Sequence, residues 1–157
     1  MILARQNKNG KYHNKVGFYY PINKEKYKSS TTPIYKSDLE RRMMRYLDST
    51  DAVLSWIYEP TCIRYIDLST IDPRTNRPGK YRRYFVDFIA SVKQKDGTIK
   101  NILIEVKSKK ETIEPKNKTN VNEYSTWIKN NCKWNAAKKF CESKNMTFVI
   151  ITDEQLT

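Results

Sequence analysis

The clearest periodic segment of the chain is a short amphipathic helix that starts near residue 37. Three apolar residues recur at four-residue spacing and so share one helix face: Leu39, Met43 and Leu47. Ser37 and Glu40 form the pattern of a capping box, in which the Ser37 side chain accepts from the Glu40 N–H and the Glu40 side chain accepts from the Ser37 N–H. We therefore predict a helix from Ser37 to about Asp48-Ser49, with its apolar face on the core.

Apolar runs between turn signals predict strands after this helix. Val53–Ile66 is broken by Glu59-Pro60 and suits one or two strands. The strongest strand patterns are 82–92 and 101–107, which are joined through Asp96-Gly97.

The last third of the chain combines a polar loop, a long helix and a final strand. Residues 111–120 are polar and predict the loop, and helical periodicity returns across Val121–Glu142, where Asn130-Asn131 could interrupt it. Thr147–Ile151 is a short apolar run of the kind found in buried strands. The resulting order, α-β-β-β-α-β, predicts an α/β domain of the α+β kind, with helices packed on a mixed sheet.

The first 36 residues differ from the rest. They show no sustained period and contain Pro21, Pro33 and a Ser-Ser-Thr-Thr run, so we predict an extended arm over 1–36 and a folded domain over 37–157. This arm holds eight Lys and Arg residues against one Glu, with aromatic residues between them. Cations beside aromatic faces suit nucleic acid, whose backbone and bases they can contact together.

Charge and composition narrow the class of partner. The chain of 157 residues carries a net charge of +13, and its basic residues fall into separate clusters, which favours a polyanion such as DNA over a merely soluble basic protein. No stretch is long and apolar enough to span a membrane, and the N-terminus lacks a secretory signal. Three cysteines without CxxC spacing and one histidine argue against a disulfide scaffold or a structural zinc site, and a reducing cytoplasm fits best.

Two acidic residues on neighbouring strands form the candidate chemical centre. A three-residue loop, Lys95-Asp96-Gly97 with a left-handed Gly97, would pair positions whose numbers sum to 192. Asp87 would then lie opposite Glu105, with Ile89 opposite Leu103 and Val86 opposite Val106. A two-residue turn at Asp96-Gly97 would instead place the two acids on opposite faces of the sheet.

Two opposed carboxylates repel one another and require a cation between them. Lys107, on the same strand face as Glu105, could supply it as a buried salt bridge, or the pair could bind Mg²⁺. Geometry leaves these two interpretations about equal. The polyanion signal favours the metal, because a divalent ion assists phosphodiester hydrolysis.

These residues resemble the PD-(D/E)xK nuclease superfamily. Asp87 stands in the first motif, with Val86 in place of the usual proline, and Glu105 and Lys107 stand in the second. The segment Ser37–Arg42 is similar to the preceding helix, which contributes a further glutamate, here Glu40. The resemblance implies a restriction-endonuclease-like core, catalytic residues Glu40, Asp87, Glu105 and Lys107, and Mg²⁺, replaceable by Mn²⁺, held by Asp87, Glu105 and Glu40.

Most of the chain is similar to the head completion nuclease family of T-even-like tailed phages. The similarity rests on Tyr19–Asn23, Tyr35–Ser37, Met44–Asp48, Lys133–Ala137 and Phe148–Thr152, with Lys26, Tyr27, Trp56 and Glu59-Pro60. It implies a metal-dependent endonuclease that acts on double-stranded DNA in DNA-filled heads before tail joining, with portal, neck or other head-vertex proteins as partners. The expected location is the host cytoplasm or the head and neck of the virion, with no membrane partner.

Basic residues close to these motifs are the candidate DNA contacts. They are Lys24, Lys26, Lys28, Lys36, Arg41, Arg82, Arg83, Lys109 and Lys133. Two rival functions remain open at this point. One is a non-catalytic DNA-binding connector that keeps the nuclease fold, and the other is a subunit similar to the TnsA transposon endonuclease.

Overall fold

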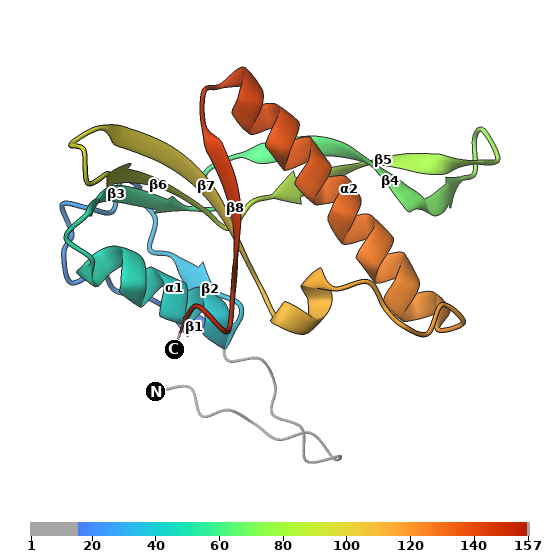
Figure 1. The fold of residues 1–157 in the computed structure, drawn as a ribbon, viewed down its shortest axis with the longest axis horizontal. Helices are drawn as coiled ribbons and strands as arrows, with labels where there is room; N and C mark the ends of the chain where they lie inside the picture. The colour runs from blue at the N-terminus through green and yellow to red at the C-terminus, as the bar shows by residue number, and fades with distance from the viewer. Residues whose placement is uncertain (1–15, 157) are drawn as a thin grey trace, which may run out of the picture.

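The structure is a computed structural model that describes residues 16–156. Its centre is a mixed four-stranded sheet in the order β3-β6-β7-β8 (Figure 1). These strands are β3 (Val53–Tyr58), β6 (Phe88–Lys93), β7 (Ile99–Lys107) and β8 (Thr147–Thr152). The pair β7–β8 is parallel, and the other two pairs are antiparallel.

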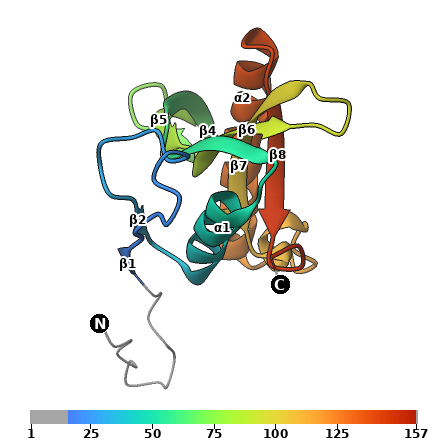
Figure 2. The same cartoon turned by 90° about the vertical axis from the view of Figure 1, so that its left-hand side faces the viewer.

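Two helices cover this sheet from different sides, as Figures 1 and 2 show. Helix α1 (Asp38–Ser49) packs Met43, Met44 and Leu47 against Trp56 and Phe88 of the sheet. Helix α2 (Val121–Ser143) packs Ala137 and Cys141 against Leu103 in a second core cluster. A short 3-10 turn, η1 (Lys109–Thr112), follows β7. No helix within residues 16–156 has the length and apolar character needed to cross a membrane.

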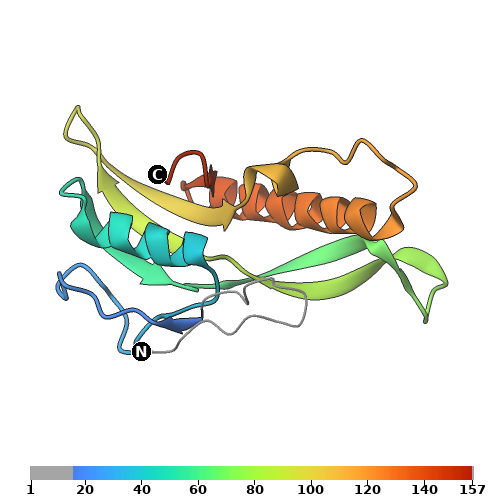
Figure 3. The same ribbon diagram turned by 90° about the horizontal axis from the view of Figure 1, so that it is seen from below.

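A long hairpin is inserted between β3 and β6. Its strands are β4 (Cys62–Asp72) and β5 (Arg77–Phe85), and it runs beside α2, away from α1 (Figure 3). Ile63, Tyr65 and Tyr84 pack on the α2 side of the hairpin. The expected order α-β-β-β-α-β is therefore incomplete, because five strands lie between the two helices.

Local signals locate both helices well. Helix α1 begins after Ser37, whose hydroxyl accepts a bond of 3.1 Å from the Glu40 backbone N–H, and it ends at Ser49. The long helix continues through Asn130-Asn131 without interruption, and Asn131 donates its side-chain amide to the Trp127 carbonyl. The mixed sheet with two helices is confirmed.

Residues 16–36 of the predicted arm lie against the domain in the structure; residues 1–15 lie outside the described part. Strands β1 (Gly17–Phe18) and β2 (Ile34–Tyr35) pair with one another. The Lys28 backbone N–H donates to the Trp56 carbonyl and the Trp56 N–H donates to the Lys26 carbonyl, at 3.0 and 2.9 Å. Residues 26–28 thus cover the outer edge of β3, which would otherwise be open to pairing with other chains.

Candidate active site

The chain changes sheets at Val86-Asp87, and this break shapes the site. Tyr84 and Val86 pack in the α2 cluster, whereas Phe88, two residues further on, packs in the α1 cluster. A continuous strand would keep all three on one face. The single strand expected over 82–92 is therefore wrong: β5 ends at Phe85, β6 begins at Phe88, and the expected pairing of Val86 with Val106 is absent.

The break gives the Asp87 side chain a backbone partner. Asp87 Oδ2 accepts a hydrogen bond of 2.8 Å from the Val106 N–H. On its other side, the Asp87 carbonyl accepts a bond of 2.7 Å from the Glu59 N–H. Asp87 is thus held between β3 and β7 at the point where the two sheets meet.

The predicted hairpin register is confirmed from Phe88 to Lys93. Ile89 pairs with Leu103 and Phe88 with Ile104, so the paired numbers sum to 192. The Gln94 N–H donates to the Thr98 carbonyl at 2.7 Å across the three-residue loop, and Gly97 has a φ of 86°. Asp87 comes just before the paired residues of β6, and its bond from the Val106 N–H holds its carboxylate beside that of Glu105.

Both carboxyls are desolvated, and each is oriented by a neutral donor. The Tyr84 hydroxyl donates to Glu105 Oε2 at 2.7 Å, as the Val106 N–H does to Asp87. Burial and the nearby charge of Glu105 raise the pKa of Asp87 well above its usual value. Burial likewise raises the pKa of Glu105, although Lys107 and Lys133 oppose this shift. Hence the pair holds two negative charges only at a cost, which a cation between the carboxylates would remove.

Two lysines lie near this pair. Lys107 is at the end of β7, and its Nζ is 3.8 Å from Glu111 Oε1. Lys133 comes from α2, with its Nζ 5.5 Å from the centre of the Tyr84 ring. Burial and then the charge of Lys107 lower the pKa of Lys133. The sequence predicts Lys133 as a DNA contact or as part of a solvated helix face, and the structure instead places it next to the buried Trp134, at the border of the inward face of α2.

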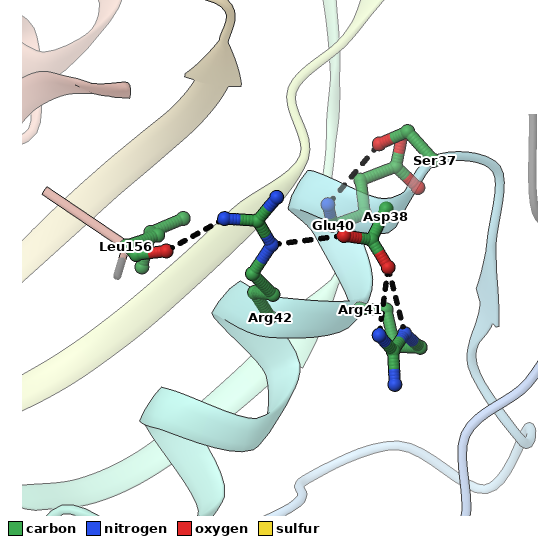
Figure 4. Close-up of polar contacts among 6 residues, drawn as sticks. All are labelled: Ser37, Asp38, Glu40, Arg41, Arg42 and Leu156. Atoms are coloured by element: carbon green, nitrogen blue, oxygen red, sulfur yellow. Dashed lines mark hydrogen bonds and ion pairs between the residues drawn. The ribbon is translucent and has the colours of Figure 1, made fainter. Parts of the chain in front are cut away.

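Glu40 lies in the first turn of α1 (Figure 4). Its Oε2 accepts from the Lys36 N–H at 2.8 Å and from the Tyr58 hydroxyl at 3.0 Å. The expected capping bond thus goes to the N–H of Lys36 rather than to that of Ser37. Among residues 16–156 no three His, Cys, Asp or Glu side chains gather closely enough to hold a metal, so Glu40 is not grouped with Asp87 and Glu105.

Glu59 is a neighbour of the site that sequence reasoning did not single out as a functional residue. It has a left-handed backbone with φ 46°, and its carboxylate pairs with the ammonium of Lys36. This contact, with smaller contributions from Glu40 and Asp87, raises the pKa of Lys36. The sequence signal that could have indicated the unusual backbone of Glu59 is Pro60, because a proline restricts the residue before it to extended or turn conformations.

The remaining predicted DNA contacts are dispersed. Lys24, Lys28 and Arg83 are exposed. The other four have partners within the chain. Lys26 donates to the carbonyls of Asp48 and Thr50, Arg41 pairs with Asp38 (Figure 4), Arg82 with the buried Asp67, and Lys109 with Glu154.

Fold, opposed acids and neighbouring lysines together define a nuclease-like α/β domain, and comparison with known proteins gives its family. The chain belongs to the TnsA-like endonuclease family, whose N-terminal family model matches residues 50–153. The chain is also similar to the head completion nuclease of Enterobacteria phage T4, with 32% identity over 150 residues that cover 89% of this chain and 92% of that protein. The resemblances to head completion nucleases and to the TnsA endonuclease are confirmed. The matched segment holds Asp87, Glu105, Lys107 and Lys133, whereas Glu40 precedes it.

Proposed function

We propose that this chain is a Mg²⁺-dependent DNA endonuclease that hydrolyses phosphodiester bonds, and that Mn²⁺ can replace Mg²⁺. The observation that carries the proposal is the closeness of the Asp87 and Glu105 carboxyls where β6 begins beside β7, both with raised pKa values and with Lys107 and Lys133 near them. Membership of an endonuclease family supports the same reaction class.

The donor set fits a hard divalent cation. Asp87 and Glu105 offer carboxylate oxygens, the ligands that Mg²⁺ prefers, and their partners Val106 N–H and Tyr84 O–H orient them without neutralising them. A bound Mg²⁺ would polarise a phosphoryl oxygen and acidify the attacking water. Lys107 and Lys133 add positive charge that can offset the negative charge developing on the phosphate.

The test is incubation of the purified protein with supercoiled and linear DNA in Mg²⁺, in Mn²⁺ and in EDTA. We expect cutting with either metal and none in EDTA. Binding without cutting, on every form of DNA and with both metals, would instead identify a non-catalytic DNA-binding protein that keeps the fold.

We further propose that the chain acts in phage head completion, on the DNA of filled heads and in contact with portal, neck or other head-vertex proteins. It would work in the host cytoplasm or as a virion component. Similarity across 92% of a head completion nuclease supports this role over that of a transposon endonuclease subunit, for which only the N-terminal family model matches. Co-sedimentation with DNA-filled heads of its phage, and none with empty heads, is the expected result.

Lys133→Gln is expected to lower metal-dependent cleavage at least tenfold, about 1.4 kcal/mol of transition-state stabilisation. The variant loses a half-buried positive charge that acts on Glu105, while its amide keeps the polar end of the side chain. Single-turnover cleavage rates provide the measurement. Lys139→Gln, at an exposed position of the same helix, is the matched control and should cut like wild type. Equal cleavage rates for the two variants would show that Lys133 does not contribute to catalysis.

Glu40→Gln separates a charge effect from a capping effect. Glutamine can still accept from the Lys36 N–H and the Tyr58 hydroxyl, so we expect the melting temperature to stay within a few degrees. We expect cleavage to fall by roughly tenfold, because the site loses one of the negative charges near Asp87 that attract a divalent cation. Thermal unfolding and cleavage rates, measured on the same preparation, distinguish the charge effect from the capping effect. A fully active variant would leave Glu40 with a structural role alone.

A further inference from the structure

The outward face of the β4–β5 hairpin is a basic and aromatic surface outside the candidate active site. Three cross-strand pairs form it: Cys62 with Phe85, Arg64 with Arg83, and Ile66 with Tyr81. Tyr81 is 69% exposed and Phe85 is 49% exposed, although both are large enough to fill a core. Arg64, Tyr81, Arg82, Arg83 and Phe85 line an open pocket of about 520 Å³ on the hairpin.

The arginine pair on this face is unfavourable for the folded chain alone. Arg64 and Arg83 lie directly opposite one another, and like charges in that position destabilise a hairpin. Within residues 16–156 neither forms an ion pair, whereas Arg82 and Arg74 are paired with Asp67 and Asp72. The only aromatic face near the Arg83 guanidinium in this described part is that of Phe85, at 5.9 Å. Two guanidinium groups are therefore presented to an external anion.

The hairpin is continuous with the site. Strand β5 ends at Phe85, two residues before Asp87, so the hairpin leads along the chain directly into the acidic pair. The inner face is already occupied, because Ile63, Tyr65 and Tyr84 pack on the α2 side. Only the outward face is open to a partner.

We propose that the outward face of the β4–β5 hairpin binds duplex DNA, with Arg64 and Arg83 on backbone phosphates and Tyr81 and Phe85 against the sugars or base edges of the groove. The proposal rests on the function proposed above. A two-stranded ribbon fits the major groove, and the planar guanidinium group suits phosphate. The net charge of +13 favours a negatively charged partner. This surface anchors the duplex on the side of the hairpin that faces away from α2 and takes no part in bond cleavage.

The test compares two doubly substituted proteins of equal charge. Arg64→Gln with Arg83→Gln alters the outward face, and Lys95→Gln with Lys100→Gln alters exposed residues at the tip of the β6–β7 hairpin. Fluorescence anisotropy of a labelled duplex, titrated in EDTA at several salt concentrations, gives the affinity and its salt dependence. We expect the arginine variant to bind at least about tenfold more weakly and to lose about 1.8 from the log–log salt slope, for two phosphate contacts. The lysine variant should change little.

Stability distinguishes a binding role from a structural one. Removing the opposed charges should leave the melting temperature unchanged or raise it, because the repulsion disappears. Equal losses of affinity in both variants would overturn the proposal, since bulk charge would then explain binding. The proposal would also be overturned if wild type is a dimer, Tyr81→Ser is a monomer and the two bind DNA equally well. The outward face would then be an interface between two copies of the chain. The two proposals can fail separately. If wild type never cuts DNA but the arginine variant still binds duplex more weakly, the DNA-binding surface is supported and only the proposed nuclease function is contradicted.

Discussion

Asp87→Asn is expected to reduce metal-dependent DNA cleavage by at least about a thousandfold, roughly 4 kcal/mol of transition-state stabilisation. Asparagine has nearly the same shape and can still accept the Val106 N–H, so the local backbone should persist. It lacks the charge needed to hold a divalent cation with Glu105. Cleavage rates and DNA affinity measured together should show lost cutting with retained binding.

The matched control for this substitution is Asp96→Asn, in the exposed turn of the β6–β7 hairpin. Its side chain can likewise keep the bond from the Thr98 N–H. We expect this control to cut DNA at the wild-type rate. Wild-type rates in Asp87→Asn would show that the opposed acids are not the catalytic centre.

Asp87→Asn should also differ from wild type in how its melting temperature changes with pH. The folded pKa of Asp87 lies above the usual value of about 3.9, so the folded state favours the protonated carboxyl. The stability that this preference gives the folded protein is fully present below a pH of about 3.9. It is lost as the pH rises through the raised pKa. In EDTA, Asp87→Asn should therefore exceed wild type in melting temperature most at neutral pH, and the difference should shrink on acidification. Adding Mg²⁺ at neutral pH should stabilise wild type more than the variant. A difference that does not vary with pH would contradict the burial of a charged Asp87.

Asp48→Ala is expected to destabilise the protein by about 3 kcal/mol, a larger stability effect than that of Asp87→Asn or Glu40→Gln. The buried carboxylate accepts from the Tyr19 hydroxyl and from the Ile22 and Asn23 backbone N–H groups, at 2.9, 2.8 and 3.0 Å. Alanine would leave all three donors without a partner and would release residues 19–23 from the end of α1. Urea unfolding monitored by Trp fluorescence measures the loss.

Asp51→Ala, an exposed acid three residues further on, controls for the change of charge and should alter stability by less than about 0.5 kcal/mol. An Asp48→Ala variant that is equally stable would show that residues 16–36 are not anchored to the domain through this carboxylate. The result also bears on truncation. Deleting residues 1–28 removes Tyr19 and Asn23, so such a variant should unfold more easily than the full chain.

Local chemistry in the sequence was sufficient for several parts of this protein. The stripe of Leu39, Met43 and Leu47 with the Ser37 cap predicted α1, because helix periodicity and capping involve residues only three or four positions apart. The three-residue loop at Lys95–Gly97 predicted the β6–β7 register from Phe88 to Lys93, and that register predicted that Asp87 and Glu105 lie close together. A turn and its flanking alternation are short-range features, so they can be read without the rest of the fold.

Long-range packing accounts for the features that sequence reasoning missed. The break at Val86-Asp87 arises because Val86 packs under α2 and Phe88 packs under α1, a choice between two cores that alternation along one strand cannot express. The charge of Lys133 acts on Glu105 only because α2 crosses the site about thirty residues later in the chain. Asp48 likewise binds residues more than twenty positions before it. Contacts between distant segments depend on how whole elements pack, and no local pattern in the chain records that packing.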